Sequence, residues 1–185
     1  DVERSRGLGD VYKRQLKILN DGRNVALDPR LAGLTPQAGT TRAESVAEQI
    51  ARIYHRDCDR VYLTEDRSGP AALPGSFQIA FCDRGTPKAD GSWTVYSAIK
   101  DELVERGVPA EEIRFIHDAK KPAQRLKLFN DAKTGKVRVV IASTERMGTG
   151  VNVQTRLAAL HHVDVPWRPI DIEQREGCLL YTSDA

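Results

Sequence analysis

The pattern of hydrophobic and polar positions divides most of this chain into short apolar runs and longer stretches of helical periodicity. The apolar runs are rich in β-branched and aromatic residues, which is typical of buried strands. They predict strands at 77–82, 113–116, 137–142 and 157–163, with a further candidate at 61–63. From residue 77 onwards the strand signal therefore recurs at regular intervals.

Between these runs, apolar residues recur every three or four positions, which indicates helices with one buried face. The periodicity predicts helices from about residue 41 to 54, at 93–106, at 122–132 and from 171 onwards, with a short helical segment around 153. Gly107 stands where a helix C-cap is expected. In the helix at 122–132 we expect Leu126 and Phe129 to face the core.

Strands that alternate with helices predict an α/β fold in which a doubly wound parallel sheet is covered by helices on both faces. Ligands of such sheets bind at the carboxyl ends of the strands. We therefore expect the loops that follow Cys82, Ile116, Ala142 and Val163 to lie along one rim and to form a site. Architecture alone names no reaction.

Composition narrows the class of protein but not its function. The chain has 185 residues, of which 40% are hydrophobic and 29% are charged, and its net charge is +2, which suits a single soluble domain. Such balanced charge does not by itself indicate nucleic-acid binding, which would have to come from local patches. No apolar run is long enough to cross a bilayer, so we expect no membrane partner. Cys58, Cys82 and Cys178 lack metal-ligand spacing, so we expect no metal site and a cytoplasmic location.

The glycine-rich stretch "STERMGTGVN" (143–152) follows the strand predicted at 137–142. Glycines and small hydroxyls at the end of a buried strand allow backbone N–H groups to approach a phosphate closely. The same pattern also fits an ordinary turn between a strand and a helix. Whether this stretch is a phosphate-binding loop or an ordinary turn depends on the motifs around it.

The two ends of the sequence can be encoded by inverted copies of one oligonucleotide. Residues 10–15 can be encoded by gatgtgtataagagacag, and the reverse complement of this DNA, read one base in, encodes residues 178–183. Unrelated ends of a protein have no reason to share such a relation. We therefore interpret residues 1–15 and 178–185 as translated sequencing-adapter DNA, which is excluded from the prediction of the fold.

The sequence between these ends divides into two parts. Residues 16–76 are expected to form a connector, with Asn-Asp-Gly and Asp-Pro breakers before residue 34, followed by the N-terminal helical part of the domain. Residues 77–177 are expected to form the core of the domain. The last predicted helix would then be interrupted by the adapter.

From about residue 77 to residue 177 the chain resembles the C-terminal RecA-like lobe of superfamily-two helicases and translocases. The motifs that carry this resemblance are "FQIAFCDRGTP" (77–87), "FIHDAK" (115–120), "STERMGTGVN" (143–152) and "QREG" (174–177). The stretch 152–177 looks like the Swi/Snf-like helicases of large phage and plasmid proteins, which are often fused to a DNA adenine methylase. The resemblance implies the second motor lobe of an ATP-dependent DNA helicase or translocase, which closes on ATP and grips one nucleic-acid strand.

The resemblance also implies roles for individual residues. The nucleic-acid backbone would be contacted by Asp83, Arg84, Gly85, Thr86, His117, Lys120, Ser143 and Thr144. The ATP-binding residues would be Gly150, Asn152, Gln174 and Arg175. Arg175, at the start of the sixth motif, is also the catalytic candidate, and its alternative role is that of a solvated helix arginine.

ATP with Mg²⁺ would be held mainly by a missing N-terminal RecA-like lobe, since this sequence contains no Gly-x-x-x-x-Gly-Lys-Ser/Thr motif. Cys178 and Tyr181 stand where the family has its finger arginines, which supply much of the rate in phosphoryl transfer. We therefore expect this chain alone not to hydrolyse ATP. His161 and His162 alternate across a strand, so they cannot both face one metal ion.

Two alternatives stay open. A degenerate RecA-like lobe would bind nucleic acid or partners without ATP turnover, and the sequence of the full-length gene would separate this case from the motor. A nucleotide-binding or methyltransferase domain would need a glycine-rich loop after its first strand and an acidic residue at its second. That combination does not occur in this sequence.

Overall fold

The computed structural model describes residues 2–35, 40–64, 66–147, 153–166 and 168–180. The chain forms two compact units, residues 1–42 and residues 43–185. Within the described residues, no helix is both long and apolar enough to cross a membrane.

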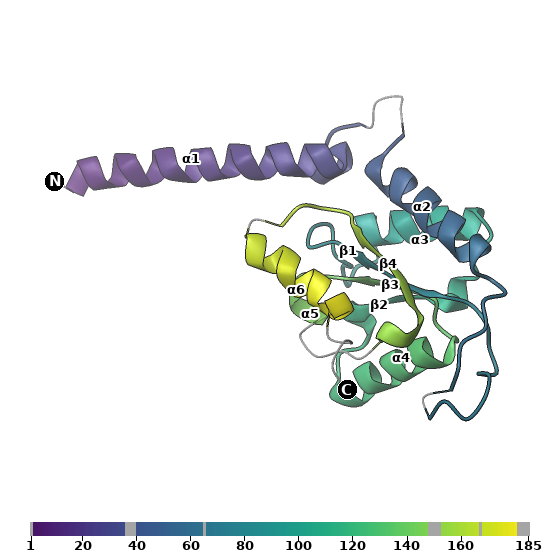
Figure 1. Ribbon diagram of the computed structural model, residues 1–185. Coiled ribbons are helices and arrows are strands. Elements are labelled where there is room, and N and C mark those ends of the chain that lie inside the picture. Colours follow the sequence, from purple (N-terminus) through teal and green to yellow (C-terminus); the bar gives the residue numbers. More distant parts are fainter. Residues whose placement is uncertain (1, 36–39, 65, 148–152, 167, 181–185) are drawn as a thin grey trace. The chain divides into compact units, whose positions relative to one another are not determined.

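The first unit is mostly one long helix, α1 (Val2–Leu27), followed by a 3-10 turn, η1 (Pro29–Ala32) (Figure 1). Asp28 caps this turn, because its carboxylate accepts the backbone N–H of Arg30 at 2.9 Å. The sequence predicts a connector with breaker residues before residue 34, and the structure shows that this stretch is helical up to residue 27. A single glycine costs a helix only about 1 kcal/mol, which is too little to end a helix rich in Lys, Arg and Leu.

The second unit is built on a four-stranded sheet in which every strand pair is parallel. Its strands are β1 (Phe77–Phe81), β2 (Ile113–Phe115), β3 (Val139–Ala142) and β4 (Leu157–His162). Their order is β2-β3-β1-β4. All four predicted strands and the parallel α/β class are confirmed. The candidate at 61–63 forms no strand, and contributes only an isolated bridge between Leu63 and Pro70.

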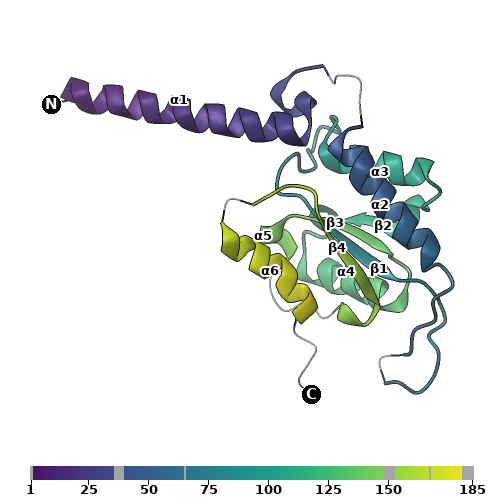
Figure 2. The ribbon, with the colours of Figure 1, turned by 45° about the horizontal axis from the view of Figure 1, so that its top comes forward.

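Helices cover both faces of this sheet. The helices are α2 (Arg42–Arg56), α3 (Val95–Glu105), α4 (Pro122–Thr134), α5 (Thr144–Met147) and α6 (Pro169–Leu180), with 3-10 turns η2 (Ala110–Glu112), η3 (Ile116–Asp118) and η4 (Gln154–Arg156). Figures 1 and 2 show α2 and α3 on one face and α4 on the other. The chain is therefore doubly wound, as predicted.

Local signals in the sequence set the ends of α3. Thr94 begins the helix through a capping box, in which its hydroxyl accepts the N–H of Ser97 at 3.1 Å and its own N–H donates to the Ser97 hydroxyl at 2.9 Å. Gly107 ends it, with a φ of 84° that few other residues tolerate. The predicted role of Gly107 is confirmed.

The core beneath α4 joins β1 and β3 to one stripe of that helix. Phe77, Ile79 and Phe81 of β1 are at most 1% exposed, and they form one cluster with Leu128 and other buried residues. Leu126 is 73% exposed, so the prediction that it faces inward is wrong. Positions 126 and 128 are about 200° apart around a helix, so only one of these leucines can face the sheet.

Polar side chains within the opposite layer are satisfied by hydrogen bonds. Gln78 of β1 donates through Nε2 to the carbonyl of Ile50 in α2 at 3.0 Å, and its Oε1 lies 2.9 Å from His161 Nε2. Burial, followed by the charge of His162, lowers the pKa of His161 to about 4. Tyr96 of α3 donates to the carbonyl of Cys82 at 2.6 Å. These bonds fix the helices to the strand that leads into the site.

Two buried arginines attach the segment before β1 to the sheet. Arg138 donates to the carbonyls of Ser76 and Tyr54 at 2.9 and 3.1 Å, and Arg156 donates to the carbonyls of Leu73 and Gly75 at 2.8 and 3.2 Å. The compact unit that contains the sheet begins at residue 43, within the stretch where the sequence predicts the N-terminal helical part of the domain.

Candidate functional site

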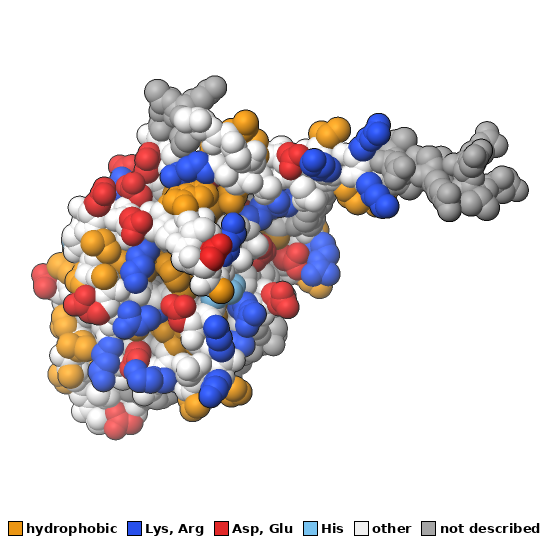
Figure 3. Space-filling view, turned by 180° about the vertical axis from the view of Figure 1, so that it is seen from behind, with side chains coloured by type: hydrophobic (Ala, Val, Ile, Leu, Met, Phe, Trp, Pro, Cys, Tyr) orange, Lys and Arg blue, Asp and Glu red, His pale blue; other side chains and the backbone are white. Residues whose placement is uncertain are grey.

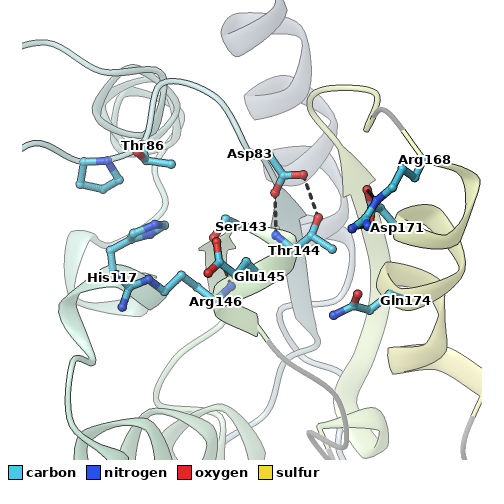
Figure 4. Close-up of a pocket in the computed structure, with 11 residues that line it drawn as sticks. Asp83, Thr86, His117, Ser143, Thr144, Glu145, Arg146, Arg168, Asp171 and Gln174 are labelled. Atoms are coloured by element: carbon cyan, nitrogen blue, oxygen red, sulfur yellow. Dashed lines mark hydrogen bonds and ion pairs between the residues drawn. The ribbon is translucent and has the colours of Figure 1, made fainter.

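An open groove of about 750 Å³ lies at the carboxyl ends of the strands. Its lining residues are Asp83, Thr86, Pro87, His117, Ser143, Thr144, Glu145, Arg146, Arg168, Asp171 and Gln174. Figure 4 shows Thr86 and His117 on one side, residues of α6 on the other, and Asp83 with Thr144 between them. The loops after β1, β2 and β3 thus meet at one rim, as the sequence predicts.

Asp83 and Thr144 meet because their strands are neighbours. β1 and β3 are paired so that their last residues, Phe81 and Ala142, lie side by side. Asp83 and Thr144 each come two positions after the end of their strand. One carboxylate oxygen of Asp83 accepts the backbone N–H of Thr144 at 2.6 Å, and the other accepts its hydroxyl at 2.9 Å. Thr144 itself is only 7% exposed.

Arg175 extends from α6 into the space behind this pair. Its side chain is fully buried and lies between two carboxylates. Nη2 donates to Asp83 at 2.7 Å and to Asp164 at 2.9 Å, while Nε donates to the hydroxyl of Thr144 at 2.7 Å. One guanidinium therefore connects α6 to the ends of β1, β3 and β4.

Every N–H group of Arg175 has an acceptor. Nη1 donates to the carbonyl of Asp164 at 2.9 Å and lies 3.4 Å from His162 Nδ1. Burial, followed by the charge of Arg175, lowers the pKa of His162, which favours the neutral ring that can accept this bond. Arg175, which the resemblance places at ATP, consequently has no donor left for a phosphate in this arrangement.

Asp164 supports the same arrangement from the end of β4. Its Oδ2 accepts the backbone N–H groups of Asp83 and Arg84 at 2.7 and 3.0 Å. Asp164 is buried and does not line the groove, and its two hydrogen bonds hold the loop after β1 in place. Sequence analysis did not select this residue, although its position directly after a predicted strand was a usable signal.

Arg146 is an exposed cation in the wall of the groove. Among the described residues, its guanidinium has no hydrogen-bond or ion-pair partner, and its backbone N–H donates to Ser143 Oγ at 3.3 Å. Burial, followed by the charge of Arg146, lowers the pKa of the neighbouring His117. The neutral form of His117 is therefore favoured, and Arg146 supplies positive charge on this side of the groove.

The opposite wall carries an exposed ion pair within α6 and the loop before it. Arg168 donates to both carboxylate oxygens of Asp171, at 3.2 and 2.9 Å, and these bonds lower the pKa of Asp171. Together with Asp83 and Glu145, this pair leaves the groove mixed in charge. Figure 3 shows the same interspersed pattern of acidic and basic side chains on the face seen from behind.

The structure brings together most of the residues that the resemblance assigns to nucleic acid. Those that line the groove are Asp83, Thr86, His117, Ser143 and Thr144. Three others, Arg84, Gly85 and Lys120, do not line it. Lining residues that sequence analysis did not select are Pro87, Glu145, Arg146, Arg168 and Asp171. Arg146 was visible within the motif at 143–152, but its sequence position alone does not show that it faces the groove.

The residues assigned to ATP are arranged differently. Gln174 lines the groove together with the nucleic-acid candidates, while Arg175 is buried behind them. Gly150 and Asn152 lie outside the described residues. Every N–H group of Arg175 has an acceptor within the chain, so in this arrangement Arg175 has none to offer a nucleotide phosphate. No group of three or more His, Cys, Asp or Glu side chains suited to a metal ion occurs among the described residues.

A comparison with protein families matches residues 85–177, slightly more than half of the chain, to the helicase conserved C-terminal domain. This range covers β2, β3, β4 and the groove-lining residues from Thr86 onwards. A comparison with curated proteins finds no match. The matched range contains three of the four strands of the parallel sheet. The chain therefore belongs to the family of helicase conserved C-terminal domains.

Proposed function

We propose that this chain is the second motor lobe of an ATP-dependent DNA helicase or translocase of the superfamily-two, Swi/Snf-like type. Its groove would bind the backbone of one nucleic-acid strand. The observation that carries the proposal is Arg146, an exposed cation without an ion-pair partner among the described residues, in a groove at the strand ends. Membership of the helicase family supports the same function.

The chemistry of the groove wall suits a phosphate backbone rather than bases. Arg146 offers a cation, and the hydroxyls of Thr86 and Ser143 offer donors in the same groove. Such groups position a strand without reading its sequence, because phosphates are the same at every nucleotide. A motor that moves along DNA needs contacts of this kind.

The roles of ATP and of further domains also belong to the proposal. A first RecA-like lobe would hold ATP with Mg²⁺, and Gly150, Asn152 and Gln174 would approach the nucleotide from this lobe. A degenerate lobe that binds nucleic acid without ATP turnover is the alternative. A phage or plasmid origin, a fused methylase and adapter-derived ends at 1–15 and 178–185 would all be tested by the uninterrupted genomic reading frame.

Binding of a fluorescein-labelled dT20 strand, followed by fluorescence anisotropy, tests the groove. We expect Arg146→Ala to weaken binding severalfold and to reduce the slope of log K against log salt by about one, since one phosphate contact is lost. Arg52→Ala is the matched control, because Arg52 is an exposed arginine on α2 that does not line the groove.

The control variant should bind dT20 as the unchanged chain does. Equal loss of affinity in both variants would indicate binding by overall charge, and would contradict a specific groove. Unchanged affinity in Arg146→Ala would also contradict the proposal. Unfolding midpoints of both variants, measured by tryptophan fluorescence, exclude a loss of fold as the cause.

A further inference from the structure

We propose that Asp83 limits the affinity of the groove for phosphate by occupying the two Thr144 donors that a phosphate would use. This inference rests on the proposed function, since it assumes that the groove binds a nucleic-acid backbone. It gives Asp83 a role opposite to the one that the resemblance implies: Asp83 competes with the strand instead of contacting it.

The geometry around Asp83 is that of an occupied anion site. The N–H and the hydroxyl of Thr144 point at separate oxygens of one carboxylate, at 2.6 and 2.9 Å, and Arg175 adds a charged donor at 2.7 Å. A phosphate also presents several oxygen acceptors, and it also binds charge-assisted donors strongly. The donors that would bind a phosphate here are therefore already satisfied by the protein.

The carboxylate of Asp83 can leave this site without leaving the buried Arg175 unpaired. Its side chain is 34% exposed and faces the groove, whereas the other partner of Arg175, Asp164, is only 7% exposed. Arg175 would keep its bonds to Asp164 if the Asp83 carboxylate turned into solvent. A buried arginine with no remaining carboxylate would be costly, and the second aspartate avoids that cost.

Removal of the Asp83 carboxylate should therefore strengthen binding for two reasons. It frees the N–H and the hydroxyl of Thr144, and it removes a negative charge from the wall of the groove. Glu145 separates these effects, because it is an exposed carboxylate in the same groove with no hydrogen bond to Thr144 among the described residues. Glu145→Ala removes the same charge but frees no donor.

Binding of fluorescein-labelled dT20 to the full 185-residue chain tests the inference. We expect Asp83→Ala to bind about tenfold more tightly than the unchanged chain, and Glu145→Ala only about twofold more tightly, since the screened charge is the smaller contribution. In ¹⁵N–¹H spectra of Asp83→Ala, the Thr144 amide resonance should shift when dT20 is added. Asp83→Asn, which keeps the side-chain shape, provides a second variant if Asp83→Ala fails to fold.

The outcomes separate this inference from the proposed function. If Arg146→Ala weakens binding but Asp83→Ala binds no more tightly than Glu145→Ala, only the inference on Asp83 is overturned. If Asp83→Ala binds more weakly than the unchanged chain, Asp83 contacts the strand and the inference is again overturned. If Arg146→Ala has no effect, the groove is not the binding site and the proposed function fails.

Discussion

At the scale of single residues, the buried guanidinium of Arg175 is the feature on which the site depends. It contacts residues that follow three different strands, Asp83, Thr144 and Asp164, and no solvent. Such a residue acts through the groups that it orients. We therefore regard Arg175 as a positioning residue, and the catalytic role that the resemblance implies for it stays untested.

The stability of the second unit should depend strongly on Arg175. Arg175→Ala would leave Asp164 buried without its cation, and loss of one partner of a buried pair costs about 3–5 kcal/mol. Arg168→Ala breaks an exposed ion pair next to the same helix, which is worth at most about 1 kcal/mol. Urea unfolding, followed by tryptophan fluorescence, should show this difference. Similar losses in the two variants would contradict the network described here.

At the scale of elements, α4 illustrates which features periodicity can and cannot predict. Its existence and its start at Pro122 follow from the pattern and from the preference of proline for the first turn. The pattern does not predict which face of the helix is buried, because apolar side chains occur around much of its circumference, at Leu126, Leu128, Phe129 and Ala132. Packing against β1 and β3 selects the stripe that contains Leu128 and Ala132.

The two leucines of α4 should therefore differ in their contribution to stability. Leu128→Ala removes a side chain from the main core cluster and should reduce the free energy of unfolding by about 2–4 kcal/mol. Leu126→Ala, on the same helix, should change it by less than about 0.5 kcal/mol, since Leu126 is exposed. Urea titrations of both variants measure this contrast. A larger effect at position 126 would show that α4 is rotated about its axis.

At the scale of the whole molecule, the chain combines the fold of its family with a groove at the ends of the strands. The parallel sheet provides a groove at its carboxyl edge, and the matched family is that of helicases. The one arginine that the resemblance assigns to ATP is saturated within its own unit. In this arrangement Arg175 therefore has no donor to offer the γ-phosphate of an ATP.

We therefore expect the purified chain not to hydrolyse ATP, with or without DNA. A phosphate loop with its lysine is absent from this sequence, and without positive charge at the γ-phosphate the transfer has no electrostatic stabilisation. Phosphate release with and without dT20, measured against a buffer blank, is the assay. Turnover that rises when DNA is added would contradict this expectation.

Much of the fold could be predicted from the sequence because its signals are local. The β-branched runs, Thr94 before α3 and Gly107 after it define elements without reference to distant residues. The alternation of those elements predicted the parallel sheet, and the sheet predicted the rim where the site lies. The helical conformation of residues 16–27 was not predicted, because breaker residues only weaken a helix and neighbouring helix formers outweigh them.

Other features were decided only by the tertiary structure. Asp83, Thr144, Asp164 and Arg175 are up to 92 residues apart, and only the strand order brings them into one network. Hydrogen-bond partners and burial then decide what each group can do. Every donor of Arg175 is used, Thr144 donates to Asp83, and the guanidinium of Arg146 is exposed without a partner among the described residues. The sequence alone determined at which edge of the sheet the groove lies, because strand ends are local features. The folded chain decided which side chains reach a ligand, because hydrogen-bond partners and burial depend on residues distant in sequence.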